Sequence, residues 1–357
     1  MGAPVRPWVG IARFGGIGDN LIASSVLPLL ARDYNVEVIT QAPQSAVFEN
    51  NPHVHKLSLK KEGEIPTGAL EWQRWFHNRE GEFEKLINLS HSCEFLVALS
   101  PGQSQYYWPK EWRQKHCNKN YLEVVHDIVG VPHEFNPRFY PTEEEVAKAV
   151  QTKARVGPKA IGWCISGSRL DKVYPHAPLA IARLIRETGL PVILFGAPKE
   201  NEIKLAKDIR RHVLKENGSV DGLEFALPKW RGTEDSDPII VDEEEAAVWP
   251  IRRSLSLLQQ CDLVISPDSG LAWGVAMESM PKIMLLSHAS PENITKHWTN
   301  TITLHTEGSG VPCWPCHRLL DDPKDCMSNK ENTAAACISS ISVETIVAMS
   351  RQALEGA

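Results

Sequence analysis

The feature that most constrains the fold is a glycine-rich turn near the start of the chain, between a short apolar strand and a helix. Residues 8–12 predict a buried strand, 15–18 form the turn, and 19–31 predict a helix with a kink point at Pro28. A second strand is predicted over 36–40. Strands joined through a helix in this way pair in parallel, so the chain is predicted to be an α/β protein.

The rest of the chain repeats this alternation. Apolar runs predict further strands at 86–89, 160–164, 192–195, 239–241, 263–265 and 283–286. Amphipathic segments predict helices at 179–187, 201–214, 251–260, 269–280 and 343–354. This pattern is typical of two Rossmann-like domains in tandem. Ligands of such sheets bind at the carboxyl ends of the strands, here in the cleft between the domains.

The limits of the domains follow from composition. Three prolines between Val131 and Pro141 and the Gly157-Pro158 pair bracket the region where the first domain ends. We expect an N-terminal domain over 1–150, a C-terminal domain over 151–305, a four-cysteine segment over 306–340 and a final helix over 341–357.

Composition excludes several classes of protein. Of the 357 residues, 42% are hydrophobic and 23% charged, as in globular rather than disordered or collagen-like chains. The net charge is −6, and residues 1–150 carry 15 Lys and Arg against 18 Asp and Glu, so neither half is a basic nucleic-acid-binding module. No run of 18 apolar residues predicts a membrane span, and no signal-peptide pattern is present. We therefore expect a cytoplasmic protein whose eight cysteines stay reduced.

The glycine turn is a candidate ligand site. Gly16 and Gly18 let the backbone approach a ligand closely, and a helix N-terminus favours anions. NAD is disfavoured because Leu21 stands where a dinucleotide fingerprint requires its third glycine. Asp19 has two interpretations. It stabilises the start of the helix, or it is a general base that accepts a proton from an incoming hydroxyl.

A second strand-to-helix turn, in the C-terminal half, is a candidate phosphate site. Asp268 or Ser269 is placed to cap the helix that follows the strand over 263–265. The backbone N–H groups of Ser269, Gly270 and Leu271 then form an anion site. Many helices start in this way, so the position at a strand end is what favours phosphate binding.

Three further loops follow strands of the same predicted sheet. Ser168, Arg169 and Lys172 combine a small residue with cations, which suits a diphosphate, although a solvated loop can have the same composition. Glu200 could accept hydrogen bonds from ribose hydroxyls or be an ordinary first-turn helix residue. His288 could approach the same site or be a loop histidine with its own partners.

Together these motifs resemble glycosyltransferase family 9, the ADP-heptose-type heptosyltransferases. The matching residues, in the same order over residues 8–300, are Gly18-Asp19, Arg169-x-Asp171-Lys172 with Pro175, Gly196-Ala197-Pro198 with Glu200, and Asp268-Ser269-Gly270. The resemblance implies a two-domain GT-B architecture. It also implies an inverting, metal-independent transfer of a heptose-like sugar from a nucleoside diphosphate such as ADP.

The resemblance also assigns roles to residues. It implies that Asp19 is the catalytic base, that Lys172 and the amides of the second turn contact the donor diphosphate, and that Glu200 contacts ribose. No catalytic divalent metal is then expected. The N-terminal domain becomes the acceptor side, and the C-terminal domain binds the donor. The chain departs from the family at Trp273, where a histidine commonly stands three positions after the Asp-Ser-Gly turn.

Four of the eight cysteines lie close together near the C-terminus. Cys313, Cys316, Cys326 and Cys337 follow a C-x2-C-x9-C-x10-C pattern that suits tetrahedral thiolate ligation. Disulfides are the alternative, which a reducing compartment disfavours, and His317 could replace one thiolate. Zinc is the physical default, whereas the segment is similar to the iron finger of bacterial autotransporter heptosyltransferases, and four-sulfur sites hold either metal. We expect a structural iron or zinc ion.

An aromatic and basic segment in the N-terminal half is the candidate acceptor side. Residues 106–119 carry four aromatic, four positive and one negative side chain, and they include Tyr106, Tyr107, Trp108 and Arg113. Aromatic rings stack on sugars or bases, and cations hold phosphates. The acceptor could be a saccharide, a protein hydroxyl or a modified nucleobase. The alternative is packing between elements, with extended Lys and Arg side chains.

The sequence thus predicts an inverting glycosyltransferase. Two other functions are compatible with the same motifs. One is a nucleotide-sugar epimerase of the same fold, which needs no acceptor. The other is a non-catalytic, degenerate transferase that uses the cysteine segment for assembly. A homo-oligomer is compatible with each of them.

Overall fold

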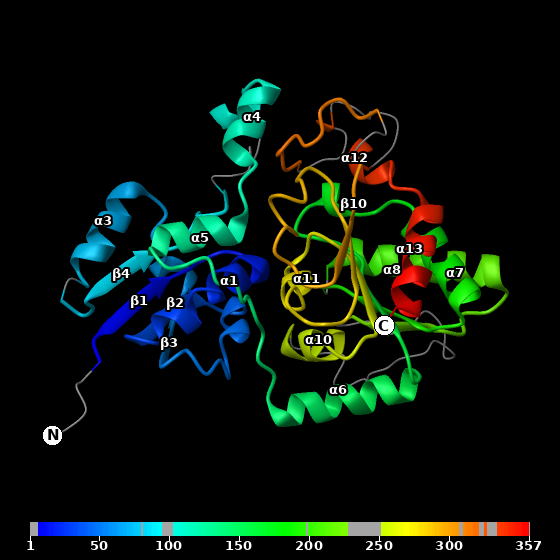
Figure 1. Cartoon of the computed structure of the whole chain (residues 1–357), viewed down its shortest axis with the longest axis horizontal. Helices are drawn as coiled ribbons and strands as arrows, with labels where there is room; N and C mark the ends of the chain where they lie inside the picture. Colours follow the sequence, from blue (N-terminus) through cyan, green and yellow to red (C-terminus); the bar gives the residue numbers. More distant parts are fainter. Residues whose placement is uncertain are drawn as a thin grey trace.

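Two parallel β-sheets lie side by side, one from each half of the chain (Figure 1). The structure, a computed structural model, describes residues 6–79, 81–94, 103–197, 199–227, 251–306, 310–320, 325–326 and 334–356. The predicted strand over 239–241 lies outside these ranges. Every helix within them is too short or too polar to traverse a lipid bilayer. The predicted α/β class and the arrangement in two parallel sheets are confirmed.

Within the described residues the first sheet has four parallel strands in the order β3-β2-β1-β4. They span Trp8–Ala12 (β1), Asn35–Gln41 (β2), Lys56–Lys60 (β3) and Lys85–Asn88 (β4). One face packs Val9 and Ile11 against helices α1 (Ile17–Ser24) and α5 (Tyr121–Val129). Helix α3 (Ala69–His77) packs aromatic rings against the other face.

In the described part of the chain the second sheet has six parallel strands in the order β10-β9-β8-β5-β6-β7. They span Ile161–Cys164 (β5), Val192–Phe195 (β6), Leu223–Ala226 (β7), Leu263–Pro267 (β8), Lys282–Leu285 (β9) and Thr301–Leu304 (β10). Strands β5, β6, β8 and β9 are buried along their whole length, as expected for a parallel sheet that is covered on both faces.

Helices cover both faces of the second sheet. Helices α7 (Ala177–Thr188), α8 (Glu200–Asn217) and α13 (Val343–Glu355) contribute to the core on one face. Helices α6 (Glu143–Val156) and α10 (Ile251–Leu258) contribute to the core on the other. Helix α6 lies where the chain passes from the first sheet to the second (Figure 1). Thr142 caps it, accepting a hydrogen bond from Glu145 N at 3.2 Å.

Some elements differ from the sequence-based expectations. The helix predicted over 19–31 is two helices, α1 and α2 (Leu27–Leu30), because Pro28 has no N–H to donate to the carbonyl one turn earlier. The helix predicted over 269–280 is only α11 (Gly270–Trp273), which ends at Gly274, a poor helix former. The unpredicted strands β3, β7 and β10 are at sheet edges. Residues of β3 and β10 are half-exposed, and β7 is a short run that Glu224 interrupts, so none of them has the long apolar run that identifies a strand.

One apolar cluster crosses the boundary between the two sheets. Val9 of β1 and Leu21 of α1 belong to the same buried cluster as Trp273 of α11 and Leu286 at the end of β9. Among the described residues, the second half has further clusters on both faces of its sheet, one beneath helices α7, α8 and α13 and one beneath α6 and α10. The two halves of the molecule are therefore joined by a shared core as well as by the chain.

Candidate active site

The glycine turn after β1 places Asp19 at the start of α1. Gly15 has a φ of 138°, in the left-handed region that glycine tolerates. Helix α1 begins at Ile17, two residues before the predicted start, so Asp19 lies in its first turn. Asp19 Oδ2 accepts a hydrogen bond from Gly16 N at 2.7 Å. Asp19 therefore does stabilise the helix start, as one of its two interpretations requires.

A buried arginine holds the other oxygen of Asp19. Arg13 Nη2 lies 3.0 Å from Asp19 Oδ1 and 3.2 Å from Glu94 Oε1. Burial opposes the charge of Arg13, but the two carboxylates outweigh this and raise the pKa of Arg13 above its ordinary value. The side chain of Asp19 keeps 30% of its surface exposed. The result is a carboxylate that is fixed at both oxygens and still accessible.

The two strand-to-helix turns meet across the boundary between the sheets. Helix α1 packs against α11 (Figure 1). A Cβ atom on Gly270 would lie 2.9 Å from Cβ of Ile17 and 3.0 Å from N of Gly18. A Cβ atom on Gly18 would lie 3.1 Å from the ring of Trp273. Close packing therefore requires glycine at both turns, and it brings the loop of Asp19 against the second turn.

Lys172 and Asp268 form a buried ion pair beside the second turn. Lys172 Nζ lies 2.6 Å from Asp268 Oδ2, and Trp273 Nε1 donates to Asp268 Oδ1 at 3.3 Å. Burial opposes both charges, but their mutual attraction is stronger, so the pKa of Asp268 is lowered and that of Lys172 is raised. Asp19 is among the charges that raise the pKa of Lys172. The predicted base and the predicted donor cation are therefore electrostatic neighbours.

Ser269, and not Asp268, caps helix α11. Its Oγ accepts a hydrogen bond from Ala272 N at 3.3 Å, whereas Asp268 pairs with its lysine. Leu271 packs into the apolar cores beside this helix. The sequence left Asp268 and Ser269 as alternative caps, and the structure distinguishes them.

A cavity of about 190 Å³ opens at the carboxyl ends of β5 and β6. Its lining residues are Ser166, Gly167, Ser168, Arg169, Val173, Lys199, Asn201 and Glu202. Two predicted donor residues, Ser168 and Arg169, thus line it, whereas the predicted Glu200 does not. Glu202, two residues further along α8, lines it instead. Its Oε2 accepts a hydrogen bond from Ala197 N at 2.7 Å, and burial raises the pKa of Glu202.

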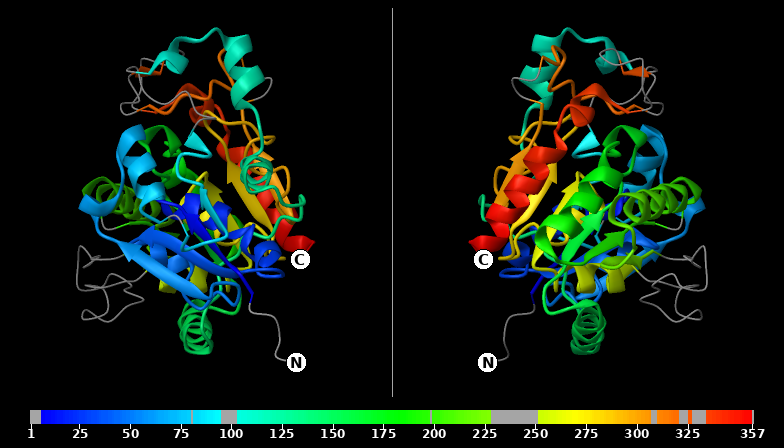
Figure 2. Two further views of the ribbon diagram at one scale, coloured as in Figure 1. Left: turned by 90° about the vertical axis from the view of Figure 1, so that its left-hand side faces the viewer. Right: turned by 90° about the vertical axis from the view of Figure 1, so that its right-hand side faces the viewer.

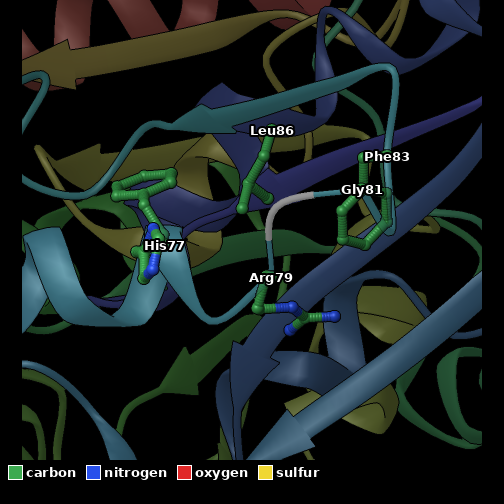
Figure 3. Close-up of a pocket in the computed structure, with 6 residues that line it drawn as sticks. His77, Arg79, Gly81, Phe83 and Leu86 are labelled. Carbon is green, nitrogen blue, oxygen red and sulfur yellow. The ribbon is translucent and has the colours of Figure 1, made fainter.

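A second cavity, of about 370 Å³, lies in the first half beside α3 and β4 (Figure 3). It is lined by Phe76, His77, Arg79, Gly81, Phe83 and Leu86. The guanidinium of Arg79 lies over the rings of Trp75 and Phe83 and pairs with Glu82 at 2.7 Å. None of the predicted site residues lines this cavity, so it is not part of the candidate active site.

The segment predicted as the acceptor side contacts the cysteine segment, residues 306–340 as far as they are described. Its helix, α4 (Lys110–Cys117), and the cysteine segment lie at the same end of the molecule (Figure 2). Arg113 Nε donates to the carbonyl oxygen of Cys316 at 2.9 Å. The two halves therefore make a further contact, through residues that are distant in sequence from the glycine turns.

The four predicted acceptor residues divide into two kinds. Tyr106 and Arg113 are buried, and the carbonyl oxygen of Tyr106 accepts hydrogen bonds from Arg318 Nε at 2.9 Å and Nη2 at 2.7 Å. These two residues fit the alternative of packing between elements. Tyr107 is 68% exposed and Trp108 is half-buried, so their rings are accessible to a ligand.

The clustered cysteines influence one another's pKa. Burial raises the pKa of Cys316 to about 12, and Cys313 adds to the effect. Burial also raises the pKa of Cys337 well above its ordinary value, with contributions from Cys316 and Cys326. Among the described residues, no group of three or more His, Cys, Asp or Glu side chains is arranged to hold a metal ion. Four thiols are suitable ligands for iron or zinc, and the metal site remains a prediction.

Sequence reasoning missed two residues of the site. Arg13 follows the first strand directly, and a charged residue in that place signals a polar partner at the strand end, but its partner Glu94 is distant in sequence. Glu202 is one of two acids in the first turn of α8. Only the orientation of that helix shows which of the two, Glu200 or Glu202, faces the cavity.

Known structures match the chain in fold. No protein-family model matches it, and no curated protein matches it in sequence. A glycosyl transferase family 9 protein from Veillonella parvula aligns over 100% of both chains, with a TM-score of 0.66 and 14% identity. The ADP-heptose heptosyltransferase II of E. coli aligns over 99% of this chain and 100% of its own, with a TM-score of 0.58 and 15% identity. The chain shares its fold with glycosyltransferases.

A third similar structure carries a metal. The dodecameric iron-containing heptosyltransferase TibC from enterotoxigenic E. coli, solved with ADP-D-beta-D-heptose, covers 98% of this chain and 77% of its own. Its TM-score is 0.55 and its identity 12%. At such low identity these likenesses establish the architecture, two parallel sheets consistent with GT-B.

Proposed function

We propose that the chain is an inverting glycosyltransferase that moves a heptose-like sugar from a nucleoside diphosphate to an acceptor hydroxyl, with Asp19 as the general base. The observation that carries the proposal is the meeting of the two glycine turns. It brings an accessible carboxylate, Asp19, close to the buried pair of Lys172 and Asp268. The glycosyltransferases that share the fold support it.

Asp19 suits the role of base because it is held and accessible. Arg13 fixes one carboxylate oxygen and the amide of Gly16 fixes the other, so the group is already oriented before the acceptor arrives. The acceptor hydroxyl gives its proton to Asp19 while its oxygen forms a bond to the anomeric carbon. The bond to the diphosphate breaks on the opposite face and its electron pair leaves with the phosphate. One displacement of this kind inverts the anomeric configuration.

Lys172 suits the role of the group that stabilises the leaving diphosphate. Its ammonium has three donors, of which Asp268 takes one, and charge that develops on a phosphate is stabilised most by fixed groups in a dry site. The backbone amides of Ser269, Gly270 and Leu271 would add to this stabilisation. Gly18, on the other side of the contact, leaves room for the donor to approach the backbone.

The cavity at the ends of β5 and β6 suits the nucleoside. A Cβ atom on its lining residue Gly167 would lie 2.6 Å from Cδ of Lys172, so the cavity adjoins the proposed diphosphate site. Ser168 and Arg169 line it on one side. We assign the ribose contact to Glu202 in place of Glu200, because Glu202 is the acid that lines the cavity.

The acceptor is proposed to dock on the exposed rings of the segment before α4. Tyr107 and Trp108 present aromatic surface, and aromatic faces stack on sugars and bases alike. A saccharide, a protein hydroxyl and a modified nucleobase all fit this chemistry.

We also propose that Cys313, Cys316, Cys326 and Cys337 hold a structural iron or zinc ion, which would tie together the ends of the cysteine segment. The four-thiol donor set and the iron-containing neighbour support this. Metal analysis of the purified chain is expected to find one ion per chain, and Cys313→Ser is expected to lose it and to lower the unfolding temperature. Cys93→Ser, at a buried cysteine elsewhere, is the control. A fully folded protein without metal contradicts the proposal.

Ligand binding tests the transferase proposal. Thermal unfolding of the full chain is measured with ADP-, UDP-, GDP- and CMP-sugars, with free ADP and with NAD, because a ligand that binds only the folded state raises its stability. We expect one class of nucleotide sugar to raise the unfolding temperature and NAD to leave it unchanged. A response to NAD alone, or to no nucleotide sugar, contradicts the proposal. An isomerised sugar nucleotide formed without acceptor would favour the epimerase.

A further inference from the structure

A second buried pair lies directly beside the pair of Lys172 and Asp268. His288 Nδ1 is 3.2 Å from Asp171 Oδ2, and both side chains are buried. Within the described part of the chain, neither oxygen of Asp171 has a hydrogen-bond partner. A buried carboxylate without a hydrogen-bond partner is costly. His288, whose Nδ1 also lies 3.1 Å from Ser287 Oγ, is the ring placed to pair with Asp171.

The two pairs are connected through the backbone. Asp171 and Lys172 are consecutive residues of one short helical turn, Leu170–Lys172. A contact that fixes the side chain of Asp171 therefore also limits where the ammonium of Lys172 can lie. His288 comes from the loop after β9, whereas Asp268 follows β8, so three strand ends converge on this turn.

His288 is itself held by the cysteine segment. The backbone N of His317 donates to the carbonyl oxygen of His288 at 3.0 Å. His317 has a φ of 55°, in the left-handed region, so the chain turns sharply directly after Cys316 to make this contact. Arg113 of α4 donates to the carbonyl oxygen of Cys316 at 2.9 Å from the other side. A continuous series of contacts thus runs from α4 through the cysteine segment to His288.

We infer that His288 is a positioning residue that acts through Asp171 to fix Lys172, and that the cysteine segment fixes His288 in turn. The inference rests on the proposed role of Lys172 in binding the donor diphosphate. It gives the cysteine segment a second function, because a segment that is otherwise remote from the donor then determines the geometry of the donor cation.

Binding of free nucleoside diphosphates to the full chain tests the inference. Affinities for ADP, UDP, GDP and CDP are measured by calorimetry. His288→Ala is expected to weaken the binding of whichever diphosphate the unaltered chain binds by roughly tenfold, as for other coupled side chains. His288→Asn is expected to restore most of this affinity, because the asparagine amide can occupy the place of Nδ1. A purely structural role would not distinguish the two variants in this way.

His297→Ala is the matched control. His297 also follows β9, and its Nε2 lies 2.7 Å from the carboxylate of Glu123. The variant therefore removes an imidazole and its carboxylate contact from the same loop region without touching Asp171. We expect the affinity for the diphosphate to stay unchanged.

A double-mutant cycle completes the test. If His288 acts through Asp171, the effects of His288→Ala and Asp171→Asn on affinity are less than additive when combined. Additive effects, or a His288→Ala variant that binds as tightly as the unaltered chain, overturn the inference and leave the proposed function standing. Failure of the unaltered chain to bind any of the four diphosphates contradicts the proposed function itself. Should His288→Ala not fold, His288→Gln, whose amide extends beyond the position of Nδ1, replaces it in the comparison with His288→Asn.

Discussion

The two glycine turns are built from the same parts and place their carboxylates in opposite environments. In the first turn Asp19 keeps 30% of its side chain exposed and is held by Arg13 and by a backbone amide. In the second turn Asp268 keeps 11% exposed and is paired with Lys172. An aspartate beside a glycine at a strand-to-helix turn therefore does not have a fixed role.

The difference shows how the neighbouring cation determines the role of the aspartate at such a turn. The cation beside Asp19 is itself buried and also pairs with a second carboxylate, Glu94, so it orients Asp19 while leaving it accessible. The cation beside Asp268 is the group that we propose for the donor, and its carboxylate is the counter-ion that keeps it in place. We therefore expect substitution at the first turn to lower mainly the rate of sugar transfer. Substitution at the second turn should lower mainly the free energy of unfolding.

The largest effect is expected at Asp19. Asp19→Asn keeps the shape and the hydrogen bond from Gly16 but removes the basic oxygen, so the rate of sugar transfer should fall by about a thousandfold, within the range known for general bases. Nucleotide affinity should change little. The measurement is a transfer assay with the donor found by thermal unfolding, and Asp33→Asn, at an exposed aspartate, is the control. Transfer at the unaltered rate would leave Asp19 with its helix-stabilising role alone.

The next effect is expected at Lys172. Lys172→Met leaves the buried carboxylate of Asp268 without its cation, which should lower the free energy of unfolding by about 3 kcal/mol. Urea unfolding measures it. Lys153→Met is the matched control, because Lys153 pairs with Asp262 at 2.8 Å in a less buried position and should cost less. Equal losses in the two variants would show that the pair of Lys172 and Asp268 contributes no more to stability than a less buried pair.

A smaller effect is expected where the turns touch. Gly270→Ala adds a methyl group 2.9 Å from Cβ of Ile17 and 3.0 Å from the backbone of Gly18, so the two helices must separate slightly, at a cost of about 1–2 kcal/mol. Gly63→Ala, where nothing lies within 4 Å of the added atom, is the control. The unfolding midpoint and the transfer rate are measured together. A stabilised Gly270→Ala protein would show that the contact between the turns is loose.

Much of the fold could be predicted because buried parallel strands are short apolar runs. Strands β1, β2, β4, β5, β6, β8 and β9 were found in this way, whereas the edge strands β3, β7 and β10 were not. In β3 and β10 the residues are half-exposed, and in β7 Glu224 interrupts an apolar run of only four residues. The turns of the candidate site were also visible, because each contains glycine, follows a predicted strand and opens a helix.

Partners that are distant in sequence could not be predicted. Glu94, the second carboxylate on Arg13, is 81 residues away from it, and the carbonyl of Cys316 is 203 residues away from Arg113. Arg113 was therefore interpreted as an acceptor residue, although the structure places it in a contact between the halves. The sequence also did not show that Glu202, and not Glu200, lines the cavity. The rotation of α8 about its axis decides this, and packing sets that rotation.

The apolar cluster that crosses between the sheets has a consequence for how the molecule comes apart. Val9, Leu21, Trp273 and Leu286 lie in one buried group, so neither half contains a complete core of its own at this boundary. Pulling the halves apart would expose apolar surface to water at a cost of about 25 cal/mol for each Å². A substitution that disrupts this cluster should therefore destabilise both halves, because each half covers apolar surface of the other.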